Sequence, residues 1–201
     1  MTPETSFKVI FVIAFVVAVG AASATARRAT ARHGGTLNQL THELRALIVI
    51  RAVLGLVFYA ALITWLFLPS AFTWAYFAAP MALRWAAAVL LIPVLLFFVW
   101  SFRSIGANYR GGVGLYDDHA LVTTGAYGLC RHPIYAAFIS IMLLVFVMSA
   151  NWVLGLSGLL LVTSIAAFRI PIEERELRER FGAEWEHYRA RAGRLVPRVR
   201  A

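Results

Sequence analysis

The stretch that decides the fold is IYAAFISIMLLVFVMSANWVLGLSGLLLVTSIAAF, residues 134–168. It holds two apolar runs, Ile134–Met148 and Trp152–Phe168, with only Ser149–Asn151 between them. A connection this short joins antiparallel helices. The sequence therefore predicts a helical hairpin whose two far ends are neighbours in space.

Three more apolar runs come earlier in the chain, Phe7–Ala26, Ala46–Leu68 and Met81–Trp100. Each is close to the roughly 20 residues that a helix needs to cross a bilayer. The chain is 61% hydrophobic and only 14% charged, whereas about a quarter of the residues in a soluble domain are charged. We therefore predict an all-α, polytopic membrane protein with about five transmembrane helices, divided into a membrane region, 1–100, and a second region, 101–201.

The first run has two interpretations. The small residues Ala22–Ala24 would suit cleavage of a signal peptide, but Glu4 and Lys8 together make a weak basic start for one. An arginine-rich segment, 27–32, follows the run directly. Arginines in that position are typical of a retained helix anchored on the cytoplasmic side, and this is the interpretation we favour.

The positive charges also predict the orientation and the partners. They gather in 27–51, 103–131 and the tail from Arg169, while Lys8 and Arg84 lie toward the other side. The positive-inside rule then places the N-terminus outside and both long polar segments in the cytoplasm. The net charge of +9 sits where anionic lipid headgroups would meet it, so we expect the bilayer as a partner and no nucleic acid.

The tail carries an apolar stripe formed by Leu177, Phe181, Trp185 and Tyr188, which share one helical face. This spacing predicts a cytoplasmic amphipathic helix that lies at the headgroups or packs over a site on that side. Gly182 inside such a helix costs about 1 kcal/mol relative to alanine. We therefore expect a packing reason for the glycine.

A polar, glycine-containing segment leads into the fourth run and reads HALVTTGAYGLCRHPIY, residues 119–135. Pro133 suits the first turn of a helix, where its missing N–H costs nothing. Gly125 and Gly128 permit turns and a close approach of the backbone to a ligand. The free N–H groups at this helix start favour an anion. Cys130 is not expected to act as a nucleophile, and no metal site is expected.

A second polar segment, RIPIEE, occupies residues 169–174 at the inner end of the fifth run. The predicted hairpin brings it beside the first segment, and we expect five side chains to converge on one pocket at the membrane surface: Arg131, His132, Tyr135, Arg169 and Glu173. Arg169 and Glu173 could instead form a surface ion pair four residues apart on a helix. Pro171 between them argues against a plain helical pair.

The 119–135 segment, followed by R-x-x-x-E-E and then L-x-x-x-F-G-x-x-W-x-x-Y, resembles the isoprenylcysteine carboxyl methyltransferase family, which is related to the phospholipid N-methyltransferases. The resemblance covers roughly Trp100–Pro197. It implies an S-adenosylmethionine-dependent methyltransferase that acts in the membrane on a lipophilic acceptor: a small molecule, a lipid or a prenylated peptide. Residues 101–201 would then be the catalytic region, with O-methylation of a carboxylate such as that of an isoprenylcysteine as the expected reaction.

Position by position, the resemblance implies which residues line the cofactor site: His119, Ala120, Leu121, Val122, Tyr127, Arg131, His132, Pro133, Ile134, Tyr135 and Glu173. Glu173 would hold the ammonium group of the cofactor, and Arg131 would pair with its carboxylate. Arg169 would face the methyl acceptor. Together with Arg131 and Glu174 it forms the expected catalytic group. Gly112 stands where a glutamine contacts the cofactor in the eukaryotic enzymes, so the Tyr109–Tyr116 loop is expected to bind differently.

The acceptor remains open at this stage. A carboxylate is already ionised near neutral pH and needs only a cation such as Arg169 to orient it. An amine would have to lose a proton, and Glu174 or His119 would then serve as the base. The arginine-rich, lysine-poor composition hints at a bacterial inner membrane, where prenylated proteins would be unexpected.

Two other classes of protein stay possible. NADPH-dependent reductases of the sterol-reductase type resemble the same C-terminal half, but HALVTTGAY (119–127) and the Glu173-Glu174 pair suit an amino-acid cofactor better than a 2′-phosphate. A non-catalytic assembly factor or small transporter is disfavoured, because a transporter should carry ionisable residues at mid-membrane positions, and these runs have almost none.

Overall fold

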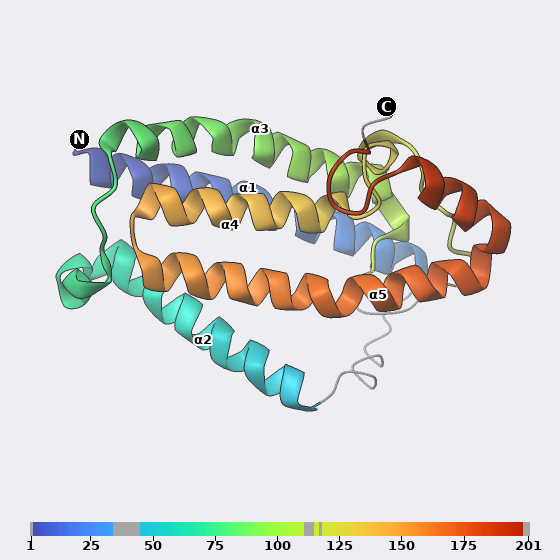
Figure 1. The fold of residues 1–201 in the computed structure, drawn as a ribbon, viewed down its shortest axis with the longest axis horizontal. Coiled ribbons are helices and arrows are strands. Elements are labelled where there is room, and N and C mark those ends of the chain that lie inside the picture. The colour runs from blue at the N-terminus through green and yellow to red at the C-terminus, as the bar shows by residue number, and fades with distance from the viewer. Residues whose placement is uncertain (1, 34–44, 111–114, 117, 199–201) are drawn as a thin grey trace. The chain divides into compact units, whose positions relative to one another are not determined.

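The structure is a computed structural model that describes residues 2–33, 45–110, 115–116 and 118–198. In this part of the chain, five apolar α-helices follow one another (Figure 1): α1 (Pro3–His33), α2 (Arg45–Phe67), α3 (Met81–Ile105), α4 (Pro133–Ser149) and α5 (Trp152–Arg191). Short 3₁₀ helices lie between them: η1 (Pro69–Ala75), η2 (Gly106–Asn108) and η3 (Gly125–Gly128). The predicted all-α class is confirmed.

Four of these helices, α1, α2, α3 and α5, are long and apolar enough to cross a membrane. The fourth predicted span, α4, is apolar but has only 17 residues, which corresponds to about 25 Å. The helices α1 and α3 extend beyond their predicted ends, to His33 and Ile105. Arginine is a good helix former, so a helix need not end where its apolar run ends.

The chain folds into two compact units, and each is assembled from three separate stretches. Unit 1 consists of Met1–Val17, Glu43–Leu95 and Phe138–Ile165. Unit 2 consists of Ala18–His42, Leu96–Ala137 and Ala166–Ala201. The predicted division into a membrane region, 1–100, and a catalytic region, 101–201, stays a prediction.

The predicted hairpin is present in unit 1, where only Ala150 and Asn151 separate α4 from α5. Ala150 adopts a left-handed backbone with φ 48°. Asn151 caps α5 by accepting a backbone N–H of its first turn on Oδ1, at 3.0 Å. Gly155 on α5 lies so close to the Phe146 ring that a side chain would collide with it. The two helices therefore pack tightly next to their connection.

Unit 1 also buries an arginine whose donors are satisfied. Arg84 is 7% exposed and pairs with Glu4 through Nη2 and Oε2 at 2.9 Å. Its Nε donates to the carbonyl of Met148 at 2.8 Å, and its guanidinium lies 4.5 Å from the centre of the Phe7 ring. Because a buried charge is tolerated only when it is paired, these contacts explain how α3 accommodates Arg84.

In unit 2 the predicted C-terminal cytoplasmic helix stays a prediction, because α5 runs to Arg191 as two helical stretches joined across a kink. Pro171 does not interrupt the helix. The helix bends instead at Gly182, with φ 49° and ψ −116°, a conformation that glycine adopts without steric cost. A Cβ at this position would meet nothing within 4 Å. The expected packing reason for Gly182 is therefore wrong, and the backbone conformation explains the glycine.

The apolar stripe of α5 is buried inside unit 2. Trp185 is 0% exposed and Tyr188 is 3% exposed, and Leu121, Leu177 and Phe181 pack against them. Burying a large apolar side chain contributes about 2–3 kcal/mol. This face of the tail therefore packs on the protein, against a segment of the 119–135 motif, and does not lie at lipid headgroups.

Candidate functional site

The backbone of the motif is shaped by two side chains from the preceding elements. Ser104 accepts the N–H of Ala126 at 3.2 Å, and Asn108 accepts the N–H of Ala120 at 3.0 Å. Gly125 has φ +63°, and a Cβ there would lie 2.5 Å from the Ser104 hydroxyl oxygen. Glycine is thus required both by conformation and by space. Sequence reasoning missed Ser104 and Asn108, which lie outside the motif and belong to no recognisable pattern.

The motif is also joined to the end of the chain. The N–H of Arg131 donates to the carbonyl of Gly193 at 2.8 Å, and the N–H of His132 donates to that of Arg194 at 3.1 Å. The next residue, Pro133, begins α4 as predicted. A side chain at Gly193 would collide with the backbone that follows it. These contacts hold the C-terminal segment against the start of α4.

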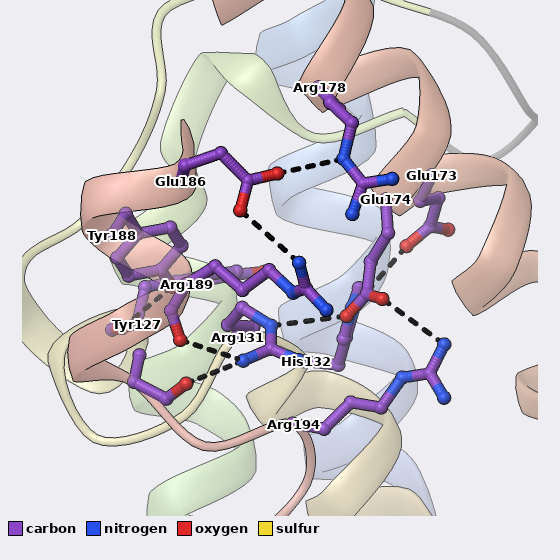
Figure 2. Close-up of polar contacts among 11 residues, drawn as sticks. Tyr127, Arg131, His132, Glu173, Glu174, Arg178, Glu186, Tyr188, Arg189 and Arg194 are labelled. Atoms are coloured by element: carbon purple, nitrogen blue, oxygen red, sulfur yellow. Dashed lines mark hydrogen bonds and ion pairs between the residues drawn. The ribbon is translucent and has the colours of Figure 1, made fainter. Parts of the chain in front are cut away.

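Glu174 forms the centre of an ionic network on α5, beyond the apolar part of that helix (Figure 2). Its Oε1 accepts from Arg131 Nε at 3.1 Å and lies 3.2 Å from His132 Nε2. Its Oε2 lies 3.1 Å from Arg194 Nη2. Burial alone would raise the pKa of Glu174, but the hydrogen bond from His132 and the charge of Arg131 lower it to about 2. Glu174 is therefore ionised and a weak base.

Arg131 also donates to the C-terminal segment, through Nη1. Its Nη1 donates to the carbonyl of Ala192 at 2.6 Å and to that of Arg189 at 3.3 Å. We call Arg131, Glu174 and Arg194, with the backbone of 189–194, the C-terminal tether. The role of Arg131 toward a cofactor carboxylate stays a prediction, because these contacts give it a structural task.

His132 lies between two carboxylates. Its Nδ1 is 3.5 Å from Glu173 Oε2 and its Nε2 is 3.2 Å from Glu174 Oε1. Carboxylates only accept hydrogen bonds, so both ring nitrogens carry a proton. Burial alone would lower the pKa of His132, but the hydrogen bonds to Glu173 and Glu174 raise it above its ordinary value. His132 is therefore a cation in this network.

These shifts predict how the stability of the protein depends on pH. The pKa of His132 is raised above 6.5, so its stabilising contribution is complete below that pH and is lost as the pH rises through the raised pKa. The pKa of Glu174 is lowered from 4.5 to about 2, so its contribution is present above 4.5 and is lost on acidification toward 2. We expect the thermal midpoint in detergent to be highest between these limits and to decline on both sides.

The control is His132→Gln, which removes one titrating group and keeps a side chain of similar size. Its midpoint should decline less than that of the wild type when the pH rises from about 6.5 to about 9. Parallel profiles for the two proteins over this range would show that His132 does not cause the loss of stability at alkaline pH.

Glu173 differs from its neighbour in how its oxygens are used. Its Oε1 accepts the hydroxyl of Tyr135 at 2.6 Å, and Arg169 is hydrogen-bonded to the same tyrosine. The side chain of Glu173 is 29% exposed, against 16% for Glu174. In the described part of the chain the Nε of Arg169 is buried without a hydrogen-bond partner. Glu173 and Arg169 thus retain capacity to bind a ligand, with Tyr135 between them.

Three tyrosines are within reach of the charge of this carboxylate, and one of them, Tyr135, donates its hydroxyl to it. The charge of Glu173 acts on the hydroxyl groups of Tyr109, Tyr127 and Tyr135. Burial raises the pKa of Tyr109, and the charge of Arg169 opposes that rise. Sequence reasoning gave Tyr109 no role of its own. Tyr109 directly follows η2, which begins at Gly106 with φ +53°. A carboxylate in contact with a phenol, as Glu173 is with Tyr135, suits an organic cation.

His119 belongs to a second group in unit 2. Its ring lies 6.5 Å from that of Phe181 and 6.4 Å from that of Tyr116, measured between centres. Burial and the charge of Arg180 lower the pKa of His119 to about 4, so the ring is neutral at neutral pH. Its Nδ1 is buried and has no hydrogen-bond partner among the residues that the structure describes.

The structure thus brings together the five side chains expected to converge: Arg131, His132, Tyr135, Arg169 and Glu173. Leu121 packs against the buried tail, and the hydroxyl of Tyr188 donates to the carbonyl of Tyr127 at 2.8 Å. Gly112, expected to replace a cofactor contact, lies outside the described residues. The roles of these residues toward a cofactor stay predictions.

Comparisons with known proteins agree with the motif. Residues 85–179 match the model of the isoprenylcysteine carboxyl methyltransferase family. Protein-S-isoprenylcysteine O-methyltransferase B of Arabidopsis thaliana is 35% identical over 83 residues, which are 41% of this chain and 42% of that protein. The Schizosaccharomyces pombe protein-S-isoprenylcysteine O-methyltransferase is 34% identical over 99 residues, 49% of this chain and 40% of that protein. The matches thus span less than half the length of these relatives.

A solved structure of a eukaryotic intramembrane Ras methyltransferase, an isoprenylcysteine carboxyl methyltransferase, shares the fold. The similarity has a TM-score of 0.58 at 22% sequence identity and covers 98% of this chain and 68% of the other. At that identity the likeness concerns the fold alone. Residues 85–179, slightly less than half of this chain, therefore resemble the isoprenylcysteine carboxyl methyltransferase family.

Proposed function

We propose that the protein is a membrane methyltransferase that takes a methyl group from S-adenosylmethionine and transfers it to the carboxylate of a lipophilic acceptor. The observation that carries this proposal is the contrast between two adjacent glutamates. Glu174 binds three cations, whereas Glu173 is more exposed and accepts the hydroxyl of Tyr135. Glu173 is therefore the carboxylate available to a ligand.

The side chains present fit the cofactor that the family implies. An ammonium group would bind Glu173 by a charge-assisted hydrogen bond. A sulfonium would lie near the π faces of Tyr127 and Tyr135, each contact worth about 0.5–2 kcal/mol. The ring of His119 is neutral and its buried Nδ1 has no partner in the described structure, so a polar group of the nucleoside would satisfy this nitrogen. When bound, S-adenosylmethionine would supply an electrophilic methyl group on a positively charged sulfur.

Arg169 is proposed to orient the acceptor. Its buried Nε lacks a partner in the described structure, and a guanidinium binds a carboxylate by two parallel hydrogen bonds. Tyr135 bonds both Arg169 and Glu173, so it sets the spacing between the acceptor and the cofactor. Holding an ionised carboxylate in line with the methyl group supplies much of the rate through positioning alone.

The weakness of the two expected bases, Glu174 and His119, favours a carboxylate acceptor over an amine. An amine acceptor must lose a proton, but the pKa of Glu174 is about 2 and that of His119 about 4. Both groups are poor proton acceptors at neutral pH. Carboxylates are ionised there without assistance, so O-methylation needs none of these groups as a base.

We also propose that the protein lies in a bacterial inner membrane and that its unit 2 faces the cytoplasm. Unit 2 carries every arginine except Arg45, Arg51 and Arg84, in agreement with the positive-inside rule. The arginine-rich, lysine-poor composition supports the bacterial assignment. The acceptor would arrive from the bilayer, and its polar end would meet Arg169 at the membrane surface.

The acceptor chemistry is tested with S-adenosylmethionine labelled in its methyl group. In detergent or liposomes we expect transfer to a farnesylated cysteine that has a free carboxylate, recovered as a base-labile methyl ester. The same compound with its carboxylate converted to an amide is the matched control and should accept nothing. Stable label in an aminophospholipid, with none in the free acid, would contradict the carboxylate proposal.

A further inference from the structure

We propose that His33, at the end of α1, is a positioning residue whose doubly protonated form fixes the segment that carries His119 in the cofactor site. His33 lies outside the region that matches the family, residues 85–179. The inference rests on the proposed function, because it concerns how that site is formed.

The contacts of His33 define its protonation state. Its side chain is 6% exposed, and its Nδ1 lies 2.9 Å from Asp118 Oδ1. Its Nε2 lies 3.1 Å from the carbonyl oxygen of Ala107. A carboxylate and a carbonyl only accept hydrogen bonds, so both contacts form only when both ring nitrogens carry a proton. The ring also stacks on Tyr116, with centres 3.8 Å apart and planes 11° apart.

Charged groups surround this contact on each element packed against it. Arg32, on the same helix, shares Asp118 through Nη2 and Oδ2 at 3.1 Å. Arg110 lies 5.0 Å from the centre of the Tyr116 ring, on the segment after η2. Burial, the charge of Arg180 and the charge of His33 each lower the pKa of His119. Asp118 is therefore the acidic group of this cluster in the described chain.

The two residues that His33 binds are each next to a residue that shapes the start of the motif. Ala107 precedes Asn108, whose side chain accepts the N–H of Ala120 at 3.0 Å. Asp118 precedes His119, whose own N–H donates to the carbonyl of Tyr116 at 3.1 Å. His33 thus holds η2 and the first residues of the motif together. A neutral imidazole has one N–H, so it would keep only one of the two contacts.

The experiment compares His33→Asn with Arg28→Ala, an exposed cation on the same helix. One readout is hydrogen exchange of residues 119–122 in the protein without ligand, and the other is the dissociation constant of S-adenosylhomocysteine. In His33→Asn we expect faster exchange and about tenfold weaker binding at about pH 6, from the loss of a charge-assisted hydrogen bond.

A second substitution, Asp118→Asn, removes the same ion pair from the other side. The double variant should bind no more weakly than the weaker single variant, because the two side chains act through one contact. Unchanged exchange and affinity in His33→Asn, or a double variant that binds more weakly than either single variant, would overturn the inference. Failure of the wild type to bind S-adenosylhomocysteine would overturn the proposed function and this inference with it.

Discussion

Replacing Glu173 by glutamine should weaken the binding of S-adenosylhomocysteine by about 100-fold. Glutamine keeps the size of the side chain and an oxygen that can accept the Tyr135 hydroxyl, which lies 2.6 Å from Glu173. It removes the charge that would hold an ammonium group, and a hydrogen bond to a charged group contributes about 1.5–3 kcal/mol. Calorimetric titration of the detergent-purified variant measures the loss directly.

The matched control is Glu184→Gln, on the exposed face of α5 beyond the bend. It removes the same charge from the same helix and should leave the affinity unchanged. Wild-type affinity in Glu173→Gln would show that this carboxylate does not hold the cofactor. The site would then have to be placed elsewhere in unit 2.

Replacing Glu174 by alanine should cause the largest loss of stability, about 3–4 kcal/mol. Removing one partner of a buried ionic network leaves the other charges uncompensated, and that costs more than the network itself contributes. Here Arg131 and His132, with side chains 10% and 5% exposed, would lose their shared carboxylate. The C-terminal tether would loosen as well. Unfolding in mild detergent, followed by circular dichroism, gives the change in midpoint.

Glu186 provides a matched control for Glu174 within the same chain. It also binds two arginines, accepting from Arg178 Nε at 2.8 Å and from Arg189 Nη1 at 3.2 Å (Figure 2). Its side chain is 48% exposed, so solvent replaces the lost contacts and Glu186→Ala should leave the midpoint unchanged. Equal losses in the two variants would mean that burial does not distinguish these networks.

The parts of the fold that were predicted depend on local chemistry. The connection at Ala150 and Asn151 is too short for anything but a hairpin, and Pro133 marks the start of α4 because a first-turn residue needs no N–H. The same local reasoning does not locate the kink in α5. Pro171 removes one helical hydrogen bond, but the helix continues through it. The bend occurs at Gly182, where the backbone takes a positive φ.

In the candidate site, too, some contacts could be predicted from the sequence and others could not. The hairpin predicted that Arg131 and His132 would meet the 169–174 segment, and the structure brings them to Glu174. The contacts of His33, Ser104 and Gly193 could not be predicted. Each joins segments far apart in the chain, and each of these three residues lies outside any periodic pattern or recognised motif. Tertiary packing alone decides them.

Titration of the wild-type protein with S-adenosylhomocysteine, with NADPH run in parallel, tests the central claim most directly. The account predicts saturable binding of S-adenosylhomocysteine and no binding of NADPH. Binding of NADPH alone would assign the site to a reductase, and binding of neither would contradict an S-adenosylmethionine-dependent enzyme.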